Sequence, residues 1–156
     1  MELKRDGTLV VRAPLRLSAE RIEAFVAAHE DWLARARARR AERLAAHPEP
    51  TEAEREALLA KAKTELPRRV AYWSRVTGLT PTGVRITGAR TRFGSCSSKN
   101  SLCFSWRLMQ YPEAAIDLVV VHELCHIAHR DHGAGFYALL GQYLPDYRAR
   151  MKLLKE

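Results

Sequence analysis

The run His122-Glu123-Leu124-Cys125-His126 constrains the fold of this 156-residue chain more than any other feature. It lies in the stretch EAAIDLVVVHELCHIAHRD, which follows Pro112 and is apolar on nearly every side from Ile116 to Leu124. Four residues turn a helix by about 400°, so the two imidazoles leave the same face one turn apart. The spacing therefore predicts a buried helix that presents two ligands to one metal ion.

A third ligand is expected because a catalytic zinc ion normally has three protein ligands and one open position. No glutamate lies between Glu123 and Glu156, whereas His132 stands six residues after His126, a known ligand distance. We therefore expect one Zn²⁺ per chain, held by His122, His126 and His132. Two aspartates remain as alternatives for the third ligand: Asp131 and Asp146.

Glu123 leaves the predicted helix beside the two histidines without having to bind the metal. A carboxylate at this place can act as general base toward water that zinc has acidified to a pKa of roughly 7. His129 occupies the position where the extended metzincin motif has glycine, and we interpret it as a partly exposed helix histidine. The catalytic candidate is therefore Glu123 alone.

The cysteines and the apolar runs exclude several classes of protein. Three cysteines, without a C-x-x-C pair, are typical neither of a disulfide framework nor of a four-cysteine zinc site. The longest apolar run of the predicted helix, Leu118 to Val121, is too short to cross a bilayer, and we recognise no secretory segment after Met1. We expect a cytoplasmic protein with no membrane partner.

The net charge of +8 arises in one part of the chain. No acidic residue lies between Glu65 and Glu113, a stretch that contains eight basic ones. A local field of one sign raises the concentration of an anionic partner. The eight residues are Arg68, Arg69, Arg75, Arg85, Arg90, Arg92, Lys99 and Arg107.

The patterning predicts one domain over residues 1–156, in two parts. Residues 1–80 contain a short strand at 8–12, an amphipathic helix from about 19 to 46, and a second helix after the capping-box pair Thr51 and Glu54. Pro67 should kink or split that second helix. Residues 81–156 contain a β-hairpin and the metal-binding helices. The expected class is α+β, with helices packed on a small antiparallel sheet around a central HExxH helix.

Two long stretches carry a family resemblance: TRFGSCSSKNSLCFSWRLMQYP and VVVHELCHIAHRDHGAGFYALLGQYLPDY. They resemble the YgjP-like family of predicted metal-dependent hydrolases, a branch of the zincin metallopeptidase-like fold. The resemblance is strong over residues 84–156 and looser before them. Phe93 departs from the family pattern, where tryptophan is common. The resemblance implies the same three histidine ligands and the same glutamate base.

The most direct interpretation is a zinc-dependent hydrolase, metallopeptidase-like, that cleaves a peptide or amide bond. In sites of this kind a strand beside the metal helix pairs with an extended peptide, and the hairpin from Arg92 to Arg107 is the candidate. Its side chains Arg92, Lys99 and Arg107 would suit an anionic group, and Tyr137 could donate a hydrogen bond to a developing oxyanion.

Two alternatives stay open at the level of sequence. The same metal and base could attack a phosphoanhydride, as in a metal-dependent nucleotide pyrophosphatase. The basic stretch is also compatible with a nucleic-acid-associated module, either SprT-like or with a purely structural zinc. A structural zinc normally has four protein ligands, which counts against the last possibility.

Overall fold

The computed structural model describes residues 1–3, 7–14, 16–46 and 49–154 of the chain. Its described residues form two compact units, Met1–Glu49 and Pro50–Glu156, and the second contains the predicted metal helix. The sequence had placed the internal boundary near residue 80, so the long helix after Pro50 belongs with the metal helix instead. That the whole chain acts as one domain stays a prediction.

The first unit consists of a small hairpin and two helices. Strand β1 (Glu2–Leu3) pairs antiparallel with β2 (Leu9–Val10). One helix was expected after Ser18, but the structure has α1 (Ala19–Ala27) and α2 (Glu30–Ala46). The break is local, because the His29 backbone N–H bonds the Val26 carbonyl and its ring Nδ1 lies 2.7 Å from the Phe25 carbonyl. Among the described residues of this unit, only Leu33 is buried.

The second unit begins with the long helix α3 (Glu52–Thr77). Its start is the predicted capping box, in which Thr51 and Glu54 each bond the other's backbone N–H. Gly78 ends the helix at φ 73°, a left-handed conformation that favours glycine. Pro67 lies inside α3, which continues as one helix, so the predicted split does not occur.

A three-stranded sheet has the order β3 (Gly83–Thr87), β5 (Ser101–Ser105), β4 (Gly94–Cys96). Strand β4 is antiparallel to β5, whereas β3 is parallel to it, so the prediction of a wholly antiparallel sheet is wrong. Residues 88–93 pass across the end of β5 and leave a gap between β3 and β4. After the turn at 97–100, β5 enters that gap and pairs with both strands. It therefore runs antiparallel to β4 and parallel to β3.

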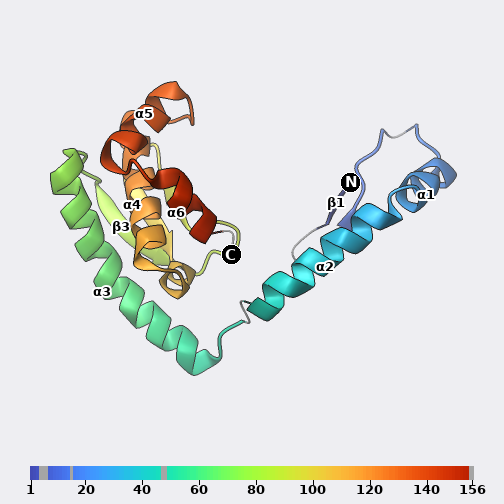
Figure 1. The fold of residues 1–156 in the computed structure, drawn as a ribbon, viewed down its shortest axis with the longest axis horizontal. Helices are drawn as coiled ribbons and strands as arrows, with labels where there is room; N and C mark the ends of the chain where they lie inside the picture. Colours follow the sequence, from blue (N-terminus) through green and yellow to red (C-terminus); the bar gives the residue numbers. More distant parts are fainter. Residues whose placement is uncertain (4–6, 15, 47–48, 155–156) are drawn as a thin grey trace. The chain divides into compact units, whose positions relative to one another are not determined.

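Helix α4 (Glu113–Ala128) lies in the middle of this unit, beside the sheet and α3 (Figure 1). Most of its residues from Ala115 to Cys125 are buried, as the all-round apolar pattern predicted. The 3₁₀ helix η1 (Trp106–Gln110) precedes α4, while α5 (Ala134–Tyr143) and α6 (Tyr147–Leu153) follow it. The α+β class is therefore confirmed. In the described ranges, the structure contains no helix with the length and apolar character that a membrane crossing requires.

Candidate metal centre

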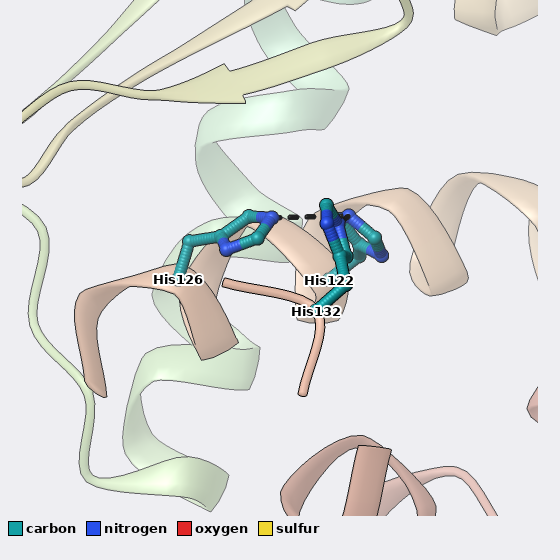
Figure 2. Close-up of side chains that lie close together, drawn as sticks. All are labelled: His122, His126 and His132. Carbon is teal, nitrogen blue, oxygen red and sulfur yellow. Dashed lines mark hydrogen bonds between the residues drawn. The ribbon is translucent and has the colours of Figure 1, made fainter. Parts of the chain in front are cut away.

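The three predicted histidines come together at the C-terminal half of α4. His122 and His126 project from the same face of the helix, and His132 approaches them from the segment between α4 and α5 (Figure 2). The Nε2 atom of His122 lies 3.2 Å from that of His126 and 3.1 Å from that of His132. His132 is exposed, whereas the other two are partly buried, so the cluster is open to solvent on one side.

The spacing of these nitrogens fits a tetrahedral zinc ion. Histidine nitrogens bound at about 2.0–2.1 Å to one tetrahedral zinc lie about 3.3 Å from one another. The ligand atoms of the triad all lie within 4.8 Å of one another, and two of the three pairs are close to the tetrahedral value. In the described part of the chain, no aspartate, glutamate or cysteine joins this group. The donor set is therefore three imidazoles, which leaves room for a further ligand.

The hydrogen-bond chemistry also favours a cation. His126 Nδ1 lies 2.9 Å from the His129 carbonyl oxygen and must donate to it, so in the neutral ring Nε2 carries a lone pair. His122 Nε2 offers a single in-plane site, a proton or a lone pair. When all three rings are neutral, at most one of the two contacts of His122 Nε2, with His126 Nε2 or with His132 Nε2, can then be a hydrogen bond. A cation between the three nitrogens satisfies every lone pair at once.

Burial keeps two of these imidazoles neutral, which is the form that binds a metal. Burial lowers the pKa of His122 from 6.5 to about 4, and the neighbouring His126 and His132 add to the effect. Burial also lowers the pKa of His126, partly opposed by the hydrogen bond to the His129 carbonyl. Protons therefore compete weakly for the site at neutral pH.

His129 ends α4 and does not join the triad. Its backbone is extended, at φ −130° and ψ 110°, so the glycine that the metzincin motif places here is not required. Its ring lies against Gly135, where an added Cβ would come within 2.9 Å of the imidazole. The interpretation of His129 as a partly exposed helix histidine was therefore incomplete, because its carbonyl orients His126.

Glu123 is buried beneath strand β4, with 6% of its surface exposed. A Cβ added to Gly94 would lie 2.6 Å from Glu123 Oε1, so a side chain at this position would force the Glu123 side chain to shift. Burial raises the pKa of Glu123 from 4.5 to about 7, and the positive charge of Arg92 opposes this rise. The carboxyl group thus titrates near neutrality, where a general base is most effective.

Phe136 packs against all three imidazoles, and it was not predicted from the sequence. Its fully buried ring lies with its centroid 4.8 Å from His122, 4.6 Å from His126 and 4.8 Å from His132. Phe136 is in the first turn of α5, four residues after His132. An aromatic residue just after a proposed ligand was the available signal, but its contact with all three rings depends on how α5 packs against α4.

Arg130 connects the segment between α4 and α5 to the β4–β5 hairpin. Its role was also not predicted from the sequence. One guanidinium nitrogen donates to the Ser97 carbonyl at 2.7 Å, and the other donates to the Ser98 carbonyl and the Asn100 side chain. Arg130 lies between two proposed ligands in sequence, and the hairpin contains Gly94, which covers Glu123. One side chain therefore joins the two segments that form the site.

The predicted substrate contacts are only partly brought to the metal centre. Arg92 is exposed before β4 and acts electrostatically on Glu123. Tyr137 has its ring centroid 6.4 Å from that of His132. Lys99 is exposed in the hairpin turn, and Arg107 lies over the Trp106 ring in η1. The roles of these four residues in binding stay predictions.

Three comparisons relate the chain to known proteins. The family model described as the YgjP-like metallopeptidase domain matches residues 1–61 and 51–156. No curated protein matches the sequence significantly. The similar solved structures include two of metallopeptidase zymogens. Abylysin of Pyrococcus abyssi has 17% identity and a TM-score of 0.49, over 55% of this chain and 86% of that one. Jannalysin of Methanocaldococcus jannaschii has 15% identity and a TM-score of 0.49, over 56% and 94%. On the match of the family model to both parts of its sequence, the chain belongs to the YgjP-like family and contains its metallopeptidase domain.

Proposed function

We propose that this protein is a zinc-dependent peptidase that uses Glu123 as general base. The observation that carries the proposal is the combination of three converging Nε2 atoms with a buried carboxyl group one residue from the first of them. A site that only stabilised the fold would need a fourth protein ligand, and none joins the triad in the described residues.

The proposed role of each side chain follows from its environment. His122, His126 and His132 would hold the metal, and the His129 carbonyl orients the second of them. A bound zinc ion supplies Lewis acidity, which polarises a carbonyl group and acidifies water. Glu123 would accept the proton of the attacking water at a carboxylate oxygen and deliver it to the leaving amine. Its pKa of about 7 suits both transfers.

A peptide substrate is supported by the position of β4. This strand is at one end of the sheet order, so one of its edges pairs with β5 and the other with no described strand. An extended peptide can pair with such an edge through its backbone. Because Gly94 in β4 contacts the Glu123 side chain, a peptide on this edge would run past the proposed base.

The basic stretch supports a preference for anionic substrates. Arg92 is exposed and close enough to Glu123 to influence its pKa. An acidic peptide side chain near the cleaved bond would therefore be attracted to this side of the site. A nucleoside triphosphate would be attracted by the same charge, so a pyrophosphatase activity is the second candidate. Binding of nucleic acid through the basic surface remains a weaker proposal.

The test compares zinc-loaded wild type with Glu123→Gln on two probes. One is fluorescein-labelled casein as an unfolded polypeptide, and the other is a set of nucleoside triphosphates with zinc or manganese. We expect the wild type to cleave casein and Glu123→Gln to retain its zinc but to lose at least about 100-fold in rate. Glu56→Gln, an exposed change on α3, is the control and should match the wild type.

The possible outcomes separate the two candidate activities. Casein cleavage at the same rate in wild type and Glu123→Gln would refute the proposed mechanism. Phosphate or pyrophosphate release that requires Glu123, without casein cleavage, would replace the peptidase by the pyrophosphatase. Elemental analysis of each preparation establishes that the compared proteins carry the same amount of zinc.

A further inference from the structure

A hollow beside Tyr137 lies outside the metal centre, because none of the three proposed histidine ligands lines it. It is open to solvent, has a volume of about 320 Å³ and is lined by Tyr137, Tyr147, Arg148 and Met151. Tyr137 is in the first half of α5, and the other three residues are on α6. Met151 is four residues after Tyr147 and three after Arg148, so its side chain is a neighbour of both on the surface of that helix.

The hollow is linked to the metal centre through aromatic rings. The Tyr137 centroid lies 6.4 Å from the centroid of His132 and 6.0 Å from that of Tyr147, on which it is stacked. An extended peptide advances about 3.3 Å per residue. A side chain about two residues from the bond at the triad can therefore reach the hollow.

All four lining groups can interact favourably with an aromatic ring. Tyrosine rings stack with another ring, and a methionine thioether makes favourable contacts with ring edges. An arginine guanidinium is attracted to a ring face. Arg148 already lies 5.8 Å from the Tyr147 ring centroid, and it forms no ion pair within the described residues.

Two of the lining side chains are exposed enough to contact a bound ring. Tyr137 is 39% exposed and Met151 is 39% exposed, which is high for large apolar side chains that lie beside each other. Neither helix covers them. A ring inserted between them would remove apolar surface of both residues from water.

We propose that this hollow is a substrate subsite that binds an aromatic side chain of the peptide, about two residues from the cleaved bond. The inference rests on the proposed peptidase function, because that function brings a peptide to the triad. It assigns Tyr137 a role in side-chain recognition, in addition to the oxyanion contact expected from the sequence.

The experiment measures binding, so it does not depend on turnover. Short peptides that end in a hydroxamate, which anchors them to the metal, carry phenylalanine or alanine at the first, second or third residue from the hydroxamate. Isothermal titration calorimetry gives their Kd for zinc-loaded protein. We expect one phenylalanine position, the second, to bind roughly tenfold more tightly than its alanine counterpart.

Variants assign that preference to the hollow. Tyr137→Ala and Met151→Ala should each reduce the preference to about twofold or less, with unchanged zinc content and melting temperature. Tyr72→Ala removes an exposed tyrosine of α3 that does not line the hollow, and it should keep the full preference. Equal binding of all phenylalanine and alanine peptides, or a preference that survives both hollow variants, would overturn the subsite. A preference that depends on the hollow in a protein that cleaves no peptide would support the subsite and refute the peptidase proposal.

Discussion

Replacing Glu123 by glutamine should stabilise the metal-free protein at neutral pH. The carboxyl group is almost fully buried, and burial raises its pKa from 4.5 to about 7. One pKa unit corresponds to about 1.4 kcal/mol, so the ionised group lowers the free energy of unfolding by about 3 kcal/mol. Glutamine has nearly the same shape and does not ionise, so it avoids this cost.

The stabilisation of the metal-free protein by Glu123→Gln should increase with pH. Between pH 4.5 and about 7 the folded protein holds a proton that the unfolded chain has released, so its stability falls as pH rises through that window. Glu123→Gln lacks this loss, and its advantage over the wild type should grow by about 3 kcal/mol from pH 4.5 to pH 8. His122, whose pKa is lowered to about 4, makes stability rise with pH over a similar range. That contribution is present in both proteins and cancels in the comparison.

Urea unfolding, followed by tryptophan fluorescence in the presence of a chelator, measures the difference at pH 4.5, 6 and 8. Glu56→Gln, which changes an exposed carboxylate on α3, is the matched control and should show no such growth with pH. A difference between wild type and Glu123→Gln that stays constant from pH 4.5 to pH 8 would show that burial does not raise the pKa of Glu123.

Three further predictions concern the parts of the site that hold the triad together. His132→Ala removes one of three proposed ligands and should weaken zinc binding at least about 100-fold in a chelator competition, whereas His29→Ala in the first unit should leave it unchanged. Gly94→Ala places a methyl group 2.6 Å from Glu123 Oε1 and should cost about 1–3 kcal/mol in urea unfolding; Gly83→Ala in the same sheet has its nearest contact at 3.9 Å and should cost less. Arg130→Gln removes the donors to the hairpin turn and should speed hydrogen exchange of the amides at 97–101 without changing that of α3, and unchanged exchange in the turn would mean that these hydrogen bonds contribute little.

The sequence predicted the parts of the site that depend on local geometry. His122 and His126 share a helix face because the helical repeat fixes that spacing, and the capping box at Thr51 is likewise local. The approach of His132 also followed from its short distance along the chain. These features require no knowledge of how distant segments pack.

Three of the missed features join segments far apart in the chain. Gly94 contacts Glu123 across about 30 residues, and Arg130 reaches the hairpin turn across a similar distance. A glycine in a short strand is a sequence signal for a close approach, but it does not name the partner. The parallel pairing of β3 with β5 was missed because periodicity identifies strands and not their neighbours.

The contact between Gly94 and Glu123 also has an evolutionary consequence. Because the carboxyl group occupies the space that any other side chain at position 94 would need, the two positions are not free to vary independently. We expect relatives that keep the glutamate to keep the glycine, although nothing at position 94 touches a metal. Conversely, a relative with a larger residue there should have changed the glutamate too, and it would then have lost the proposed base. Glycine at this strand position is thus expected to accompany the proposed base among relatives of this chain.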